Sequence, residues 1–175
     1  MRFPNRTSTI GTLINTYLTT STSQLNDQTI HLLFSANRWE AAANIESVLS
    51  AGTSIVCDRY AFSGVSYSTA KHLDMSWCMS CDRGLPAPDA VIFLDIAAED
   101  AAERGNYGEE RYEKLEFQRE VQTNFAKLRH STNDATPWFV LDAKRVIDDL
   151  HNEIENIVKD VTENVKYKPI AKLWL

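Results

Sequence analysis

Apolar side chains recur at helical spacing along several stretches of the chain. Five apolar residues between positions 10 and 18 follow the i, i+3, i+4, i+7, i+8 spacing of one helix face, which predicts an amphipathic helix after Arg6. A longer helical region is predicted over residues 28–51, with Gly52 as a plausible C-terminal stop. The remaining segments that we interpret as helical cover residues 96–104, 112–130 and 147–161.

Short apolar runs between these helices predict buried strands over residues 53–57, 90–94 and 138–141. Strands that alternate with helices indicate an α/β fold with a parallel sheet. In such sheets, ligands bind beyond the carboxyl ends of the strands. The pair Asp58-Arg59 follows the first run and Asp142 follows the third, so these residues are predicted to lie at the ligand-binding edge.

Composition limits the class of protein. The 175 residues fit one domain, and 43% hydrophobic with 24% charged residues is ordinary for a globular chain. The formal net charge of −6 argues against a nonspecific nucleic-acid binder, because such proteins are normally basic. An anionic substrate would therefore have to be held by a local cluster of cations. The longest apolar run, residues 90–94, is too short to cross a bilayer.

The N-terminus and the cysteines predict a reducing compartment. Pro4, Asn5 and Arg6 interrupt what would be the apolar core of a secretory signal, and an odd count of three cysteines does not suit a disulfide framework. We expect a cytoplasmic location, with the nucleus also open. Cys78 and Cys81 form a CxxC pair, but no second ligand pair or strand-to-helix setting accompanies it. Packing is therefore favoured over a zinc or redox role.

Three segments carry candidate chemistry: FPNR at residues 3–6, HLLFSANRWE at 31–40 and DRYAFSG at 58–64. Arg6 immediately precedes a predicted helix, whose N-terminal end favours anions. Arg59 at a strand end can grip phosphate oxygens in bidentate fashion. Asp58 beside it can hold Mg²⁺ through water, although an ion pair or a helix N-cap is an equally simple reading of the residue alone.

The middle segment places an aromatic ring and a cation on one helix face. Phe34 and Arg38 are four residues apart, so both face the same way. A flat base can stack on Phe34 while Arg38 donates hydrogen bonds to its carbonyl edge. The alternative is that Phe34 belongs to the core. Gly64 in the third segment lets the backbone approach a ligand closely.

Together, and in this order, the three segments closely resemble the thymidylate kinase family. The resemblance extends from Phe3 to the Leu173-Trp174 tail. It implies an α/β fold, the three-layer parallel-sheet P-loop nucleoside monophosphate kinase fold, with residues 1–175 as a single domain. It also implies transfer of a phosphoryl group from ATP to dTMP, with Mg²⁺ and with no nucleic acid or membrane as partner. Because the family is usually dimeric, we expect a homodimer, for which helices within residues 29–50 could supply the interface.

The resemblance also implies roles for individual residues. Arg6 and Arg59 would contact the acceptor phosphate, and Asp58 would lie near the metal. Phe34 and Arg38 would bind thymine. The residues that match family positions around the sugar and base are Phe3, Pro4, Gly64, Tyr67 and Tyr112, of which Tyr112 would lie near the 2′ position of the sugar.

Residues 104–113 resemble the lid that closes over the phosphates in this family. Gly105 and Gly108 would give it freedom to move, and closure would exclude water. The lid tip contains no Lys or Arg between Gly105 and Glu110, which resembles the eukaryotic and poxviral type. Lid and ATP contacts are expected from Arg104, Asp142 and Lys144.

One expected motif is absent from the printed sequence. A P-loop kinase uses Gly-x-x-x-x-Gly-Lys-[Ser/Thr] to hold the donor phosphates, and these residues do not occur here. The chain begins where the family's second strand begins, so three interpretations stay open. The sequence is an incomplete record of an active thymidylate kinase, a noncatalytic nucleotide-binding or interaction module, or a kinase for another nucleotide.

Overall fold

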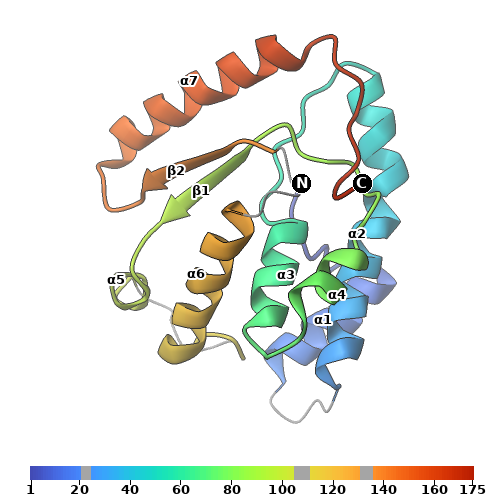
Figure 1. Ribbon diagram of the computed structural model, residues 1–175, viewed down its shortest axis with the longest axis vertical. Helices are drawn as coiled ribbons and strands as arrows, with labels where there is room; N and C mark the ends of the chain where they lie inside the picture. The colour runs from blue at the N-terminus through green and yellow to red at the C-terminus, as the bar shows by residue number, and fades with distance from the viewer. Residues whose placement is uncertain (21–24, 105–110, 131–135) are drawn as a thin grey trace.

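The computed structural model describes residues 1–20, 25–104, 111–130 and 136–175 (Figure 1). In Figure 1 the two strands lie between α7 on one side and α6 on the other, α3 lies beside α6, and α2 runs along the right-hand side of the molecule. The elements follow in the order α1 (Thr9–Thr19), α2 (Asp27–Ser50), α3 (Ala61–Thr69), α4 (Met75–Ser80), β1 (Val91–Asp95), α5 (Ala98–Ala102), α6 (Leu115–Arg129), β2 (Trp138–Asp142) and α7 (Ile147–Val165).

Side-chain caps explain where several helices begin. Ser8 accepts a hydrogen bond from the backbone N–H of Gly11 at the start of α1, and Asn26 accepts one from Thr29 at the start of α2. Asp74 does the same for α4. These residues satisfy N–H groups that the helix itself leaves without a partner. Both long predicted helices in the first third of the chain are therefore confirmed within one or two residues of their expected bounds.

The parallel pair β1–β2 confirms two predicted strands and their direction. Val91 pairs with Trp138 at one end of the pair, and Asp95 pairs with Asp142 at the other. Both strands thus end in a carboxylate at the same edge of the sheet. Beyond that edge, the backbone N–H of Ala143 donates to the carbonyl oxygen of Asp95 over 2.9 Å.

The prediction of a buried strand over residues 53–57 is wrong. The segment forms no strand and is mostly exposed, with Val56 79% accessible. Among the described residues, a single parallel bridge lies just beyond this segment, between Arg2 and Asp58. One bridge does not make a ladder, so the β-branched composition that favours a strand is present without the neighbours that would complete one.

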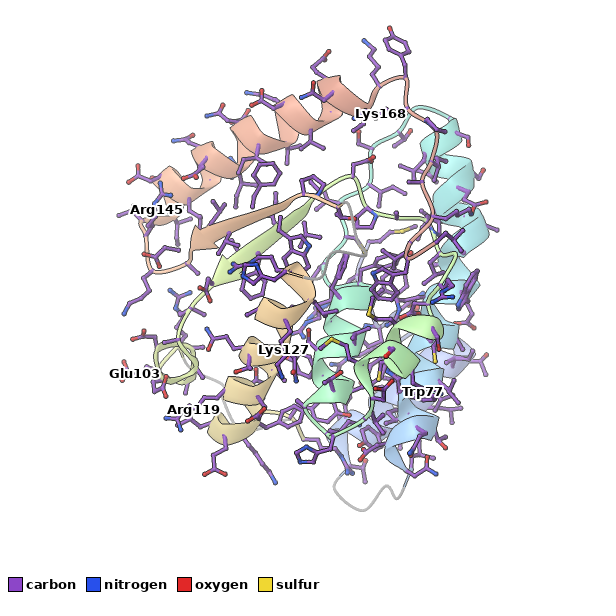
Figure 2. The ribbon with its side chains drawn as sticks, in the orientation of Figure 1. Trp77, Glu103, Arg119, Lys127, Arg145 and Lys168 are labelled. Carbon is purple, nitrogen blue, oxygen red and sulfur yellow. The ribbon has the colours of Figure 1, made fainter. Side chains whose placement is uncertain are left out.

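Two apolar clusters hold the helices together. The larger joins α2, α3, α4 and the C-terminal tail around Phe62, Cys78, Leu85 and Leu173. The smaller joins α1 and α2 and consists of Ile14, Tyr17, Leu18 and Ile30. Figure 2 shows Arg145 and Lys168 near the two ends of α7, which projects many of its polar side chains outward. Among the described residues, no helix combines the length and apolar character needed to cross a membrane.

A buried histidine connects α2 to α3 and α4. The ring of His31 is fully buried, with Nε2 at 3.1 Å from the carbonyl oxygen of Cys78 and Nδ1 at 2.7 Å from Oγ of Ser68. A carbonyl only accepts, so Nε2 carries the proton and Nδ1 accepts from the hydroxyl. Burial lowers the pKa of His31, which keeps the ring neutral in the folded protein.

We expect stability to fall as the pH drops through about 6.5, the ordinary pKa of histidine. Below that pH the unfolded chain takes up a proton that the buried ring of His31 does not, which favours unfolding. Urea unfolding between pH 5.5 and 7.5 measures this slope. The slope should flatten in His31→Gln and persist in His151→Gln, since His151 is exposed on α7. An equal slope in the parent and in His31→Gln would contradict the assignment.

Candidate active site

The first and third chemical segments lie side by side. The backbone N–H of Phe3 donates to the carbonyl oxygen of Asp58, and the N–H of Asp58 donates to the carbonyl oxygen of Met1, both over 2.9 Å. The ring of Phe3 packs against that of Tyr60 with centroids 5.6 Å apart. The segment that carries Arg6 therefore runs next to the segment that carries Arg59.

The second segment joins them through a buried asparagine. The side-chain oxygen of Asn37 on α2 accepts from the backbone N–H of Asn5 over 2.7 Å, and its amide nitrogen donates to the carbonyl oxygen of Asn5 over 3.2 Å. Arg6 donates to Oδ1 of Asn15 over 3.0 Å. A cavity of about 840 Å³ opens here, and Phe3, Pro4, Arg6 and Asn37 are among its lining residues.

Arg59 lies over an aromatic ring and has an unusual backbone. Its φ of +62° falls in the left-handed region, which a non-glycine residue rarely adopts. Its guanidinium carbon lies 5.4 Å from the centroid of the Tyr67 ring. The neighbouring Asp58 carboxylate is largely exposed and lies 3.2 Å from Nε of Arg2. An exposed carboxylate at this position suits a hydrated divalent cation, which prefers oxygen ligands.

The aromatic side of the site joins α2, α3 and the start of α6. Phe34 and Tyr112 both pack, half-buried, against the smaller apolar cluster. The ring of Tyr112 lies 5.8 Å from that of Tyr67 and stacks on that of Phe117 at 5.3 Å. Burial and the nearby Tyr17 raise the pKa of Tyr112 well above its ordinary value, so its hydroxyl stays protonated and can donate a hydrogen bond.

Arg38 is buried one helical turn beyond Phe34. Its Nε and Nη2 donate to the two carboxylate oxygens of Asp82, over 3.0 and 2.6 Å. Gly64 on α3 lies against the same guanidinium, because a Cβ on this glycine would come within 2.8 Å of Nη2. The close approach that glycine permits here is thus to Arg38.

A second group of predicted residues meets beyond the carboxyl ends of β1 and β2. Nη2 of Arg104 donates to the carbonyl oxygen of Ala143 over 2.7 Å. Nζ of Lys144 donates to Asp100 over 2.8 Å, and the backbone N–H of Lys144 donates to the carboxylate of Asp142, also over 2.8 Å. These contacts border a cavity of about 530 Å³, whose lining includes Asp95, Asp100, Gln122, Asp142 and Lys144.

Comparison with known proteins decides the family. The thymidylate kinase family model matches residues 1–154. The chain is 46% identical to the thymidylate kinase of Dictyostelium discoideum, over 99% of this chain and 76% of that protein. It is 42% identical to the human thymidylate kinase, over 99% of this chain and 81% of that protein. The chain belongs to the thymidylate kinase family.

A solved structure supports the same conclusion for the fold. The thymidylate kinase of Candida albicans superposes with a TM-score of 0.84 at 36% identity, covering 91% of this chain and 78% of that one. The predicted α/β fold with a parallel sheet, and the predicted phosphotransferase class, are thereby confirmed for this member of the thymidylate kinase family.

The structure brings the predicted residues of this thymidylate kinase family member into two groups. Arg104, Asp142 and Lys144 gather at the strand ends. The larger group occupies the end of the molecule formed by α1, α2 and α3, and consists of Phe3, Pro4, Arg6, Phe34, Arg38, Asp58, Arg59, Gly64, Tyr67 and Tyr112. The lid tip with Gly105 and Gly108 lies outside the described residues.

Several contacts at this site could not be expected from sequence. Arg111 donates from Nε to the carbonyl oxygen of Tyr17 over 3.1 Å and from Nη2 to that of Thr20 over 2.9 Å. It thereby satisfies carbonyls at the end of α1, where a cation is favourable. Lys71 lies between Asp27, at 2.8 Å, and the hydroxyl of Tyr112, at 3.4 Å. Long side chains that reach across the fold leave no spacing signal in the sequence.

Cys78 packs in the larger apolar cluster, as the packing interpretation predicts. Burial raises the pKa of its thiol to about 12. The thiolate is the reactive form of cysteine, so this side chain is inert at neutral pH. Within the described part of the chain, no three His, Cys, Asp or Glu side chains gather as metal ligands do.

Gly64→Ala should destabilise the protein by about 1–3 kcal/mol, because the added methyl group would press on the buried guanidinium of Arg38. Urea unfolding measures the change. Ser63→Ala, at the preceding and only half-buried position of α3, is the matched control and should stay within about 0.5 kcal/mol of the parent. Equal stability of Gly64→Ala and the parent would show that Arg38 relaxes at no cost.

Proposed function

We propose that this chain binds dTMP and transfers the terminal phosphoryl group of ATP to it, giving dTDP and ADP. The observation that carries the proposal is the hydrogen-bonded pairing of residues 1–3 with Asp58, which sets Arg6 and Arg59 on adjoining segments. Two guanidinium groups are the natural partners of a phosphate dianion. Membership of the thymidylate kinase family supports dTMP as the molecule that carries this phosphate.

The neighbouring side chains suit the rest of the acceptor. Phe34 would stack on the thymine ring, and Arg38 would donate hydrogen bonds to a carbonyl of the base. Tyr67 and Tyr112, whose rings lie 5.8 Å apart, would face the sugar. Phe3, Pro4 and Gly64 would complete the walls. A donor hydroxyl on Tyr112 in this place would crowd a 2′-hydroxyl and so favour the deoxyribose.

The donor side would use the residues at the strand ends. Arg104 begins the proposed lid over residues 104–113, and Asp142 and Lys144 would contact ATP beside it. Asp58 would hold hydrated Mg²⁺, which supplies charge neutralisation for the phosphates when bound. The chemistry needs alignment and charge stabilisation and no covalent enzyme intermediate. Residues 1–175 would act as one domain.

Two measurements test the proposal. Calorimetric titration with dTMP should show saturable binding, and ADP release with ATP should be fastest with dTMP among dTMP, dUMP, UMP and thymidine. Absence of dTMP binding would reject the acceptor site. Binding without ADP release would leave a nucleotide-binding module, and equal or faster use of another acceptor would reassign the substrate.

We further propose a homodimer and a cytoplasmic location. The three cysteines are free, which supports a reducing compartment. Two large apolar side chains on α2 are exposed seven residues apart, Leu32 at 50% and Trp39 at 43%. A spacing of seven puts them on one helix face, which suits packing against a second copy.

Leu32→Glu should convert the proposed dimer to a monomer, because it places a charge within an apolar interface. Sedimentation velocity measures the change in mass. Glu155→Gln on α7 is the control and should leave the mass unchanged, since its carboxylate pairs only with Lys159 one turn away in the described structure. A parent chain that sediments as a monomer would reject the dimer.

A further inference from the structure

One ion pair stands apart from the others in burial. Arg38 is 2% exposed and Asp82 is fully buried, and they share two hydrogen bonds. Each of the other ion pairs between described residues has at least one side chain that is more than a third exposed. A buried pair gains little stability over apolar side chains of the same size, because both charges lose their water. Stability alone therefore does not explain why this pair is buried.

The loop that carries Asp82 is held to α2 on both sides of Arg38. The carbonyl oxygen of Cys81 accepts from Oγ of Ser35 over 2.8 Å and from Nε1 of Trp39 over 3.0 Å. Ser35, Arg38 and Trp39 follow the i, i+3, i+4 spacing of one helix face. Four hydrogen bonds thus join this face of α2 to two consecutive loop residues, which leaves the carboxylate little freedom to move.

The far end of the same loop is fixed as well. The backbone N–H of Gly84 donates to the carbonyl oxygen of Leu173 over 2.9 Å, and the N–H of Leu173 donates to that of Leu85 over 2.8 Å. The backbone N–H of Asp82 donates to the carbonyl oxygen of Met79 over 3.1 Å, at the end of α4. Asp82 is therefore held between a helix and the C-terminal tail.

The pairing leaves one end of the guanidinium for another acceptor. Asp82 accepts hydrogen bonds from Nε and Nη2, and Nη1 makes no hydrogen bond with another described residue. Long side chains on a helix point toward its N-terminus, which here is the turn that carries Phe34. Gly64 packs against the same end of the guanidinium, because a Cβ on this glycine would come within 3.0 Å of Nη1 and 2.8 Å of Nη2. In the proposed function, these N–H groups would donate to a carbonyl of the base that stacks on Phe34.

We propose that Asp82 is a positioning residue that holds the Arg38 guanidinium in the orientation that recognises a carbonyl of the thymine base. The proposal rests on the proposed function, in which Arg38 contacts the base of dTMP. Asp82 itself touches no substrate. It removes the rotational freedom of a long side chain before the ligand arrives, and such preorganisation raises affinity by reducing the entropy lost on binding.

Thio-substituted nucleotides test whether Asp82 orients Arg38 toward the base or only packs in the fold. Sulfur is a weaker hydrogen-bond acceptor than oxygen, so the 2-thio or the 4-thio analogue of dTMP should bind the parent chain about tenfold more weakly than dTMP. In Asp82→Glu the charge remains but the carboxylate is displaced. This variant should bind dTMP about tenfold more weakly than the parent does. It should also bind dTMP and the thio analogue that the parent binds weakly with equal affinity. Asp160→Asn, on the exposed side of α7, is the control and should behave as the parent.

The outcomes decide between the two proposals. A parent chain that does not bind dTMP rejects the proposed function. A parent that binds dTMP and both analogues equally rejects recognition of a base carbonyl by Arg38, and the positioning role with it, but leaves phosphoryl transfer to dTMP standing. An Asp82→Glu variant that keeps the full preference for dTMP overturns the positioning role alone. If the variant unfolds, the Nε–H signal of Arg38 in the unliganded parent gives the answer by NMR relaxation. A rigid signal before dTMP is added supports positioning, and a mobile signal that becomes rigid only on binding overturns it.

Discussion

Arg59→Ala should lower kcat/KM for dTMP by about 100-fold, and the affinity for dTMP by a comparable factor. Truncating one member of a charged, hydrogen-bonded pair costs about 2–5 kcal/mol, and each 1.4 kcal/mol is tenfold. Arg59 carries a phosphate-binding guanidinium in the proposed function. Its φ of +62° is a backbone conformation that arginine rarely adopts, and such outliers concentrate at functional sites. The ADP-release assay and calorimetry measure the two losses.

Controls separate the lost guanidinium from the altered backbone. Arg119→Ala removes an equally large cation that projects outward from α6 (Figure 2) and pairs with Glu99, and it should leave kcat/KM within twofold of the parent. Arg59→Gly relieves the left-handed backbone, so it should unfold no more easily than the parent while losing as much activity as Arg59→Ala. An Arg59→Gly variant that keeps its activity would show that the backbone, and not the guanidinium, is what the site needs.

The candidate site could be proposed from sequence because its residues lie in short motifs. Residues 3–6 and residues 58–64 each hold several candidate site residues within seven positions, and the structure pairs the two segments directly. What spacing could not show was the support. Asp82 lies 44 positions beyond Arg38, and Arg111 lies 94 positions beyond the Tyr17 carbonyl that it contacts. Such distant partners depend on tertiary packing, which no local pattern encodes.

The strand predicted over residues 53–57 is wrong for a related reason. A β-branched run measures how well side chains fit a pleated surface, whereas a strand exists only where backbone groups find partners. The runs at β1 and β2 pair with each other, from Val91 with Trp138 to Asp95 with Asp142. Among the described residues, the 53–57 run pairs with no strand, and the bridge next to it joins Arg2 to Asp58.

The largest stability effect should come from the C-terminal tail. Trp174 is 9% exposed and meets Phe62 edge to face with ring centroids 5.7 Å apart, and Phe62 in turn packs on Trp138 of β2 at 5.0 Å. Trp174→Ala should lower the free energy of unfolding by about 3–5 kcal/mol, because it empties an aromatic site in the larger apolar cluster. Urea unfolding measures the loss. Tyr167→Ala, an aromatic truncation in the same tail at a residue 91% exposed, should change stability by less than about 0.5 kcal/mol.

The tail also bears on the site, because Leu173 next to Trp174 exchanges hydrogen bonds with Gly84 and Leu85, two and three residues beyond Asp82. Loosening the tail should therefore loosen the carboxylate that holds Arg38. Under conditions where Trp174→Ala is still folded, we expect its affinity for dTMP to fall about threefold and its preference for dTMP over the weaker thio analogue to narrow in parallel. A variant that loses stability but keeps the full preference would show that the α2 contacts of Ser35 and Trp39 hold the loop without help from the tail.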